Sequence, residues 1–270
     1  MKTRILASVV LLPLLLLIVL AAPKIFTAIL VGLIAAIGAY ELLRGTGIVR
    51  HPRLISYSMV MAMLTGLWCY FRWAAVWVQL GLLLFFVLLF AEMMLAHKQL
   101  LFEKVIVCFA AGVLLPYLLT ALVRLHGDEN GRFLILIPFV LAFLSDTGAY
   151  FVGCAFGKHK LAPNISPKKT IEGLVGGVLG AMLGMVLYCV ILQSFFAFRV
   201  NYGYAVIYGL LGSLGAVFGD LCFSVIKRQT GIKDYGNLIP GHGGILDRFD
   251  SMMIVGPLVE LLMILLPVAV

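Results

Sequence analysis

The sequence contains little charge. Only 12% of its 270 residues are Asp, Glu, Lys or Arg, and just 12 residues are acidic. Soluble domains are about 45–50% apolar, whereas this chain is 63% hydrophobic and has a mean hydropathy of +1.12. A water-soluble core could not bury that much apolar surface. The composition therefore excludes a soluble globular protein and predicts a polytopic membrane protein.

Several sequence motifs are also missing. The five cysteines form no C-x-x-C pair, which argues against a zinc site or a disulfide framework. There is no Walker-type G-K-[ST] sequence, and the D-G-x-x-A-R motif of CDP-alcohol phosphotransferases is absent. The net charge of +8 does not indicate nucleic acid as a partner, because the basic residues lie between apolar runs and not on one solvated face.

Long apolar runs dominate what remains. A run of about 20 residues can cross a bilayer as a helix, and the runs predict an all-α transmembrane bundle of about nine spans. Their approximate bounds are 5–22, 25–43, 54–71, 74–96, 105–123, 133–156, 173–198, 203–226 and 250–269. The first has the charged start of a signal peptide, but its apolar run of about 18 residues exceeds the usual 7–15 and favours a retained helix.

The distribution of basic residues predicts the orientation. Lys and Arg are enriched in cytoplasmic loops. With the N-terminus in the cytoplasm and the C-terminus outside, 15 of the 20 Lys and Arg residues fall on the cytoplasmic side. Two cytoplasmic loops, 157–172 and 227–248, are longer than the others and basic. We therefore expect residues 1–125 to form a scaffold of helices, and residues 126–270 to form the catalytic helices with these two loops.

Polar residues are expensive in a membrane protein, and the densest group lies around residues 220–250. Asp220, Ser224, Lys227 and Arg228 are spaced i, i+4, i+7 and i+8, so they share one face of a helix near the predicted cytoplasmic surface. This face combines an anion, a hydroxyl and two cations, which suits a phosphate-handling site. The alternative is a charge pair at a helix end, with cations that extend toward the interface.

A second acidic group follows at the start of the last predicted span. Asp247 and Asp250 lie three residues apart, where helix capping is the alternative role for one of them. The glycines before them allow backbone N–H groups to approach phosphate oxygens closely. Carboxylates from separate helices, Asp220 and Asp247, could converge on Mg²⁺, which takes one or two carboxylates and otherwise water and phosphate. Asp146, deep in the sixth predicted span, is either a further ligand or a structural anchor.

Other polar residues have two possible roles each. Lys168, Lys169 and Thr170 are predicted to grip phosphate, although the lysines also satisfy the orientation rule. His242 suits phosphate, metal or a simple turn. The glycines spaced through 173–184 predict close helix–helix packing and not a nucleotide site. The remaining charged groups Glu41, Glu92 and Glu103 are expected to form interfacial ion pairs with basic neighbours such as Arg44, His97, Lys98 and Lys104.

Three blocks within residues 140–256 carry a family resemblance. They read S-D-T-x-A-Y-F-x-G from Ser145, S-P-K-K-T-x-E-G from Ser166, and S-x-x-K-R … K-D-x-G … P-G-H-G-G-x-x-D-R-x-D from Ser224. Together they resemble the signature of phosphatidate cytidylyltransferases. The resemblance implies that CTP and phosphatidic acid react on Mg²⁺ to give CDP-diacylglycerol and pyrophosphate. It also implies that Asp220 and Asp247 are ligands of the metal centre.

These observations give one set of expected site residues. We expect the catalytic group to be Asp220, Asp247, Lys227 and Arg228. The expected metal ligands are Asp220 and Asp247, with Asp146 as a third candidate and a second metal ion as an open alternative. The expected substrate-binding residues are Lys168, Lys169, Thr170, Ser224, His242, Gly243, Arg248 and Asp250.

The predicted setting is the bacterial inner membrane, with membrane lipids as partners, the site facing the cytoplasm, and a homodimer as an open alternative to a monomer. No general base is needed, because a phosphate monoester with a second pKa near 6 is largely ionised at neutral pH. The competing function is a transporter or flippase for an anionic phosphate-containing solute. That function predicts polar residues throughout the membrane depth, whereas here they gather toward one face.

Overall fold

The computed structural model describes residues 13–238, 241 and 243–269. Helices dominate these residues, and the named strands among them form a single two-stranded hairpin. The predicted all-α class is therefore confirmed. The chain forms two compact units: unit 1 comprises the described residues up to Arg132 together with Gln229–Phe249, and unit 2 comprises Phe133–Arg228 and the described residues from Asp250 onward. The functional division that we place at residue 125 stays a prediction.

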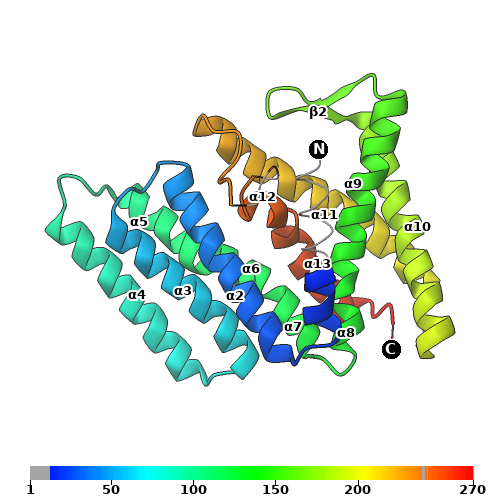
Figure 1. Ribbon diagram of the computed structural model, residues 1–270, viewed down its shortest axis with the longest axis horizontal. Coiled ribbons are helices and arrows are strands. Elements are labelled where there is room, and N and C mark those ends of the chain that lie inside the picture. The colour runs from blue at the N-terminus through cyan, green and yellow to red at the C-terminus, as the bar shows by residue number, and fades with distance from the viewer. Residues whose placement is uncertain (1–12, 239–240, 242, 270) are drawn as a thin grey trace. The chain divides into compact units, whose positions relative to one another are not determined.

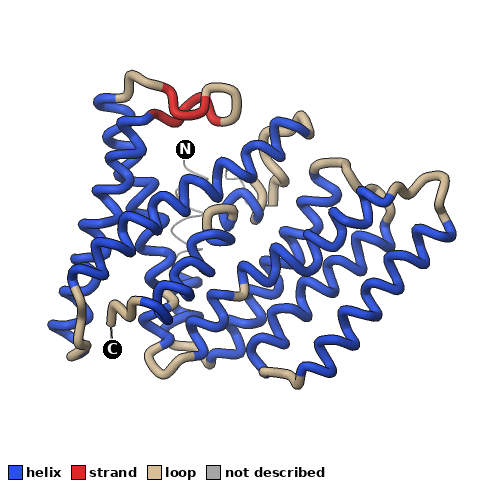
Figure 2. Tube along the Cα trace, turned by 180° about the vertical axis from the view of Figure 1, so that it is seen from behind, coloured by secondary structure: helices blue, strands red, loops and turns tan. Residues whose placement is uncertain are grey.

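Unit 1 is a set of apolar helices joined by short loops. In chain order they are α2 (Lys24–Tyr40), the π-helix η1 (Glu41–Gly45), α3 (Pro52–Phe71), α4 (Ala75–Leu95), α5 (Phe102–Phe109), the π-helix η2 (Ala110–Leu114), α6 (Leu115–Leu119), α7 (Ala121–Gly127) and the short α12 (Leu246–Phe249). Helices α2, α3 and α4 lie side by side (Figures 1 and 2). Small residues allow this: a Cβ on Gly66 of α3 would lie 2.9 Å from the Gly32 Cα of α2.

The described residues of unit 2 form four long helices and the hairpin. They are α9 (Leu136–Phe156), β1 (Lys160–Ala162), β2 (Ser166–Thr170), α10 (Ile171–Phe196), α11 (Tyr202–Gln229, whose last residue belongs to unit 1) and α13 (Met252–Leu265). The one-turn helix α8 (Gly131–Leu134) lies where the chain passes from unit 1 to unit 2. The hairpin joins the adjacent ends of α9 and α10 (Figure 1). The end of the described chain is fastened to the start of α11, because Asn201 N–H donates to the Val268 carbonyl at 3.0 Å.

Helices α9 and α10 pack along the glycine series of α10, as the sequence predicts. A Cβ on Gly177 would lie 2.9 Å from the Ser145 carbonyl oxygen, and one on Gly180 would lie 2.8 Å from that of Leu144. Larger residues would therefore push the two backbones apart. The close approach fixes α9 and α10 against each other and so gives the hairpin between them a rigid base.

The predicted spans are matched in part. Among the described residues, seven helices are long and apolar enough to cross a membrane: 24–45, 52–71, 75–95, 102–127, 131–156, 171–196 and 202–229. The first predicted span, 5–22, is described only from residue 13 onward, and residues 13–20 are helical. The ninth corresponds to α13, which has 14 residues and so spans about 21 Å of a hydrocarbon core of about 30 Å. The count of nine and the orientation remain predictions.

Candidate active site

The basic loop 157–172 contains the β1–β2 hairpin. The two strands pair antiparallel, with Lys160 opposite Thr170. Lys168 is exposed on β2, and Lys169 is half-buried. Thr170 begins helix α10, because its hydroxyl accepts the Gly173 N–H at 3.1 Å, a typical N-cap. The hairpin therefore presents both predicted phosphate-binding lysines from an ordered strand, where the sequence led us to expect a loop.

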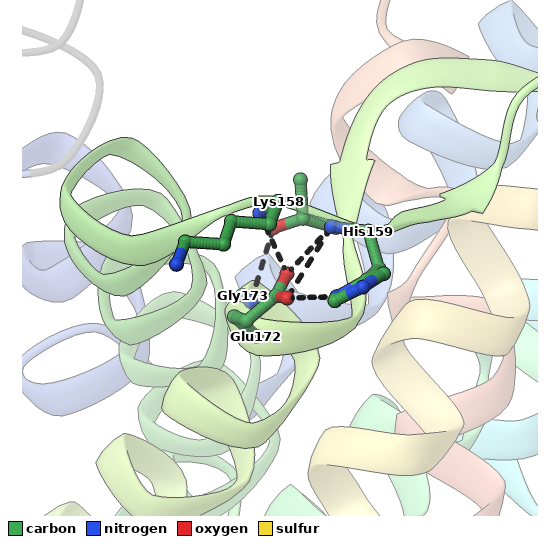
Figure 3. A network of polar contacts seen from close by, with 5 residues as sticks. Lys158, His159, Glu172 and Gly173 are labelled. Atoms are coloured by element: carbon green, nitrogen blue, oxygen red, sulfur yellow. Dashed lines mark hydrogen bonds and ion pairs between the residues drawn. The ribbon is translucent and has the colours of Figure 1, made fainter.

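The base of the hairpin is closed by Glu172 (Figure 3). Its carboxylate accepts the backbone N–H of Lys158 at 3.1 Å and that of His159 at 3.2 Å. The His159 ring lies against the same group, with 2.6 Å between Nδ1 and Oε1. Three contacts from one side chain connect the end of α9 to the first turn of α10, and they fix where the hairpin leaves the helices.

Helix α11 carries the centre of the polar cluster in unit 2. The half-buried Asp220 forms an ion pair with Lys169 of β2, so the hairpin and α11 meet through opposite charges. Ser224, one turn later, donates its hydroxyl to Asp220 Oδ1 at 3.4 Å, as the i, i+4 spacing predicts. The Arg228 side chain contacts the hairpin turn: its Nε–H donates to the Ile165 carbonyl at 3.1 Å. That contact fastens α11 to the turn of the hairpin.

Asp250 completes this cluster. It is buried, lies outside the seven candidate spans and accepts the Ser251 N–H at 2.7 Å. Burial, and secondly the negative charge of Asp220, raise the pKa of the Asp250 carboxyl, while the positive charge of Lys227 opposes them. The close approach has a backbone cause: a Cβ on Gly219 would lie 3.1 Å from the Asp250 carbonyl oxygen. Unit 2 thus brings together Lys169, Asp220, Ser224, Lys227 and Asp250.

Asp247 belongs to unit 1 and is held differently. Its Oδ2 accepts the Tyr235 N–H at 2.8 Å and the Gly244 N–H at 3.0 Å. The segment before α12 folds back around this oxygen, helped by Gly243, which has a φ of +89° that side chains rarely adopt. Two backbone donors therefore fix the carboxylate in place, which is a stronger constraint than the helix capping considered from the sequence.

Glu41 is a polar residue of this region that the sequence did not indicate. The expectation that it forms an interfacial ion pair is wrong. The side chain is buried in unit 1, and its carboxylate accepts the Ile245 N–H at 3.0 Å and the Leu246 N–H at 2.7 Å. Glu92 does form an ion pair, but with Arg53 at 3.2 Å and not with its sequence neighbours. An acidic residue inside an otherwise apolar helix end was the available signal for Glu41.

The remaining predicted residues are distributed as follows. Arg248 is exposed on α12, and Asp146 is exposed halfway along α9. His242 lies outside the described residues. In the part of the chain that the structure describes, no three His, Cys, Asp or Glu side chains come together as a metal centre. Site assignments for these residues stay predictions.

Mg²⁺ suits the available donors. The negative charge of Asp220 acts on the Asp250 carboxyl, and a divalent cation would offset the repulsion between two such carboxylates. Two carboxylates are enough for Mg²⁺ when substrate phosphates and water complete its coordination. The cations Lys169 and Lys227 in the same cluster suit the additional phosphate charge. The side chains of the cluster therefore fit a polyanion and a metal ion chemically, and the metal stays a prediction.

The chain is similar to known proteins. The model of the cytidylyltransferase family matches residues 2–266. The phosphatidate cytidylyltransferase of Staphylococcus haemolyticus (strain JCSC1435) is 43% identical over 136 residues, and that of Staphylococcus aureus (strain COL) is 44% identical over 141 residues. Each alignment covers 50% of this chain and 51% of the relative, so the chain spans about half the length of the curated relatives it matches.

The seven apolar helices and these bacterial relatives identify an integral membrane protein. The motif blocks named above fall within the stretch covered by the family model. Because that model matches nearly the whole sequence, the chain belongs to the cytidylyltransferase family.

Proposed function

We propose that this protein transfers the cytidylyl group of CTP to phosphatidic acid, forming CDP-diacylglycerol and releasing pyrophosphate. The observation that carries the proposal is the charged cluster of unit 2, in a chain whose family model covers residues 2–266. Lys169 pairs with Asp220 there, and the charges of Asp220 and Lys227 act on the Asp250 carboxyl. The names of the relatives supply the lipid and the nucleotide.

In the proposed reaction, a phosphate oxygen of phosphatidic acid forms a bond to the α-phosphorus of CTP. The bond from that phosphorus to the β-phosphate oxygen breaks, and pyrophosphate leaves with the electron pair. The attacking phosphate is ionised near neutral pH, so no residue has to remove a proton. The obstacle is the mutual repulsion of two polyanions.

The basic residues would lower that repulsion. Two unit charges 4 Å apart repel by about 4 kcal/mol at an effective dielectric of 20. Lys169 and Lys227 would neutralise phosphate oxygens in unit 2, and exposed Lys168 and Arg248 would bind more distant phosphates. Arg228 would act mainly by holding the hairpin, since its side chain already bonds to Ile165.

The metal assignment is part of the proposal. Asp220 and Asp247 are the predicted ligands of Mg²⁺, and Asp250 joins them as a candidate because the charge of Asp220 acts on its carboxyl. When bound, Mg²⁺ would supply positive charge to the phosphates and to the leaving pyrophosphate. A second metal ion and a role for Asp146 belong to the same proposal. Dimer formation stays a prediction that no observation on the chain supports further.

We place the site at the cytoplasmic face of a bacterial inner membrane, with membrane lipids around the helices. The support is the basic character of the two long loops and the bacterial source of the relatives. A transporter or flippase for an anionic solute is not favoured by the comparisons.

The decisive experiment incubates purified protein with labelled CTP, phosphatidic acid and Mg²⁺ in detergent micelles. We expect label in the lipid phase and an equal amount of pyrophosphate. Labelled CTP that stays wholly aqueous, with protein that is folded and metal present, would reject the proposed reaction. Uptake of a labelled anion into proteoliposomes without chemical change would support the transporter instead.

A further inference from the structure

Glu41 connects the end of α2 to the glycine-rich segment before α12, which lies about 200 residues later in the sequence. It opens the π-helix η1, a rare local structure that often marks functional positions. Only 4% of its surface is exposed. Its two carboxylate oxygens accept the backbone N–H groups of Ile245 and Leu246, at 3.0 Å and 2.7 Å. A buried carboxylate is costly unless it is hydrogen-bonded, and these charge-assisted bonds meet that need.

The glycines of the segment are fitted to this side chain. A Cβ on Gly236 would lie 2.5 Å from Glu41 Oε1, and a Cβ on Gly244 would lie 2.5 Å from Oε2. Such distances are below any ordinary contact. Two glycines that the sequence suggested for phosphate binding therefore have a second reason to be glycine: they make room for Glu41.

The other side of η1 is fitted in the same way. A Cβ on Gly45 would collide with the Tyr235 carbonyl oxygen, and Tyr235 is 2% exposed. One turn before Glu41, a Cβ on Gly38 of α2 would touch Leu246 at 3.5 Å. Three positions at the end of α2 and in η1, namely Gly38, Glu41 and Gly45, thus contact the segment. The contacted residues are Tyr235, Gly236 and the stretch 244–246.

The same stretch determines where Asp247 points. The two N–H groups that Asp247 Oδ2 accepts come from Tyr235 and Gly244. Gly45 packs against the first of these residues, and Glu41 packs against the second while bonding the two residues that follow it. Both backbone donors to Asp247 are therefore supported from η1.

We propose that Glu41 is a positioning residue for Asp247: its buried carboxylate holds the glycine-rich segment so that Asp247 is presented in one orientation. The inference rests on the proposed function only where it assigns Asp247 a role in the reaction. Residues assigned above to the scaffold then contribute directly to the geometry of the site.

The test compares Glu41→Gln with the unchanged protein by hydrogen exchange, without added metal or substrate. Glutamine keeps the size of the side chain but turns one acceptor into an NH₂ donor facing a backbone N–H. We expect exchange at the amides of Ile245 and Leu246 to accelerate about 10- to 100-fold, the range for loss of a bond to a charged group. Peptides from α3 and α9 should exchange as before.

A second readout separates positioning from general destabilisation. If Asp247 is displaced, the Mg²⁺ concentration for half-maximal CDP-diacylglycerol synthesis should rise about tenfold. A smaller folded fraction would lower the maximal rate and leave the Mg²⁺ requirement unchanged. Glu92→Gln is the matched control, because Glu92 is also buried in unit 1 but bonds Arg53 and Tyr57. It should leave both the exchange of Ile245 and the Mg²⁺ requirement unaltered.

The packing of Glu41 can also be disturbed by substituting Gly244, which contacts it. Gly244→Ala should also raise the Mg²⁺ requirement. The double variant Gly244→Ala/Glu41→Asp has a shorter acidic side chain, which makes room for the added methyl group, and should bring the Mg²⁺ requirement part of the way back. This pair keeps the test available if Glu41→Gln does not fold. Folded Glu41→Gln with unchanged exchange at Ile245 and Leu246, or strictly additive effects of the Gly244 and Glu41 changes, would overturn the proposal. A wild-type protein without synthetic activity would reject the proposed reaction and leave the exchange result to stand by itself.

Discussion

The two units of this protein hold their acidic residues by different means. In unit 1, Asp247 is fixed by two backbone N–H groups, in a segment that Glu41 supports. In unit 2, Asp220 is held by side chains, through an ion pair with Lys169 and a hydroxyl from Ser224. Backbone donors cannot move without refolding the segment, whereas a lysine can exchange one anion for another.

This difference suggests a division of labour. A carboxylate held by the backbone is preorganised and suits a ligand whose position must not vary. A carboxylate paired with lysine can release that lysine to an incoming phosphate, so we expect the Lys169–Asp220 pair to act where substrate exchanges. Substitutions in each unit test whether the two arrangements really differ in this way.

The largest effect is expected at Asp220. Asp220→Asn removes the carboxylate that pairs with Lys169, and with it a predicted metal ligand. We expect cytidylyl transfer to fall by about 10³-fold, measured as label entering lipid, with an unchanged elution profile. Asp128→Asn, the same charge change in the turn between α7 and α8, serves as control. Activity within tenfold of wild type would remove Asp220 from the metal site.

Asp247→Asn should have the second largest effect. An amide oxygen in the place of Oδ2 can still accept both backbone N–H groups, so the segment keeps its fold while the negative charge is lost. We expect a loss of about 10²-fold, together with a higher Mg²⁺ requirement. Loss of activity at Asp220 alone, with Asp247→Asn fully active, would confine the metal site to unit 2 and leave Asp247 a structural role.

Lys169 and Lys168 form a matched pair on strand β2. Lys169 meets Asp220, whereas Lys168 is exposed. Lys169→Gln should reduce the catalytic efficiency for CTP about tenfold, the loss of one bond between charged groups, and Lys168→Gln should reduce it less. Equal effects would mean that both lysines act through general positive charge and not through the contact with Asp220. Initial rates over a range of CTP concentrations would separate these outcomes.

The sequence predicted local features better than distant ones. Long apolar runs have one stable solution in a bilayer, so seven helices agree with predicted spans. Spacing along one helix placed Ser224 beside Asp220. Glu41 was misread because Arg44 lies three residues away and offers a local partner, whereas its real donors, Ile245 and Leu246, lie more than 200 residues later. Periodicity carries no information about such a contact.

The hairpin shows a second limit. Residues 160–170 contain Pro163 and Asn164, which are typical of turns, and this favoured a loop over paired strands. The pairing depends on Glu172, which bonds the backbone of Lys158 and His159 from the next helix. That contact forms only once α9 and α10 are packed through their glycines. The strands therefore follow from tertiary structure more than from local propensity.

The smallest effect on activity is expected for Glu172→Gln. This substitution tests whether unit 2 also depends on hydrogen bonds from a carboxylate to the backbone. Glu172→Gln keeps one acceptor for the N–H groups of Lys158 and His159 but weakens the contact with the imidazole. Exposed charged contacts contribute little to stability, so the hairpin should open locally without unfolding the unit. We expect trypsin cleavage at Lys158 and Lys160 to accelerate about two- to fivefold, with a smaller loss of activity.

An unchanged cleavage rate would show that the β1–β2 pairing and the Arg228 contact with Ile165 are enough to hold the hairpin. Unit 2 would then keep its basic strand in place without Glu172, unlike the segment in unit 1 that is expected to depend on Glu41.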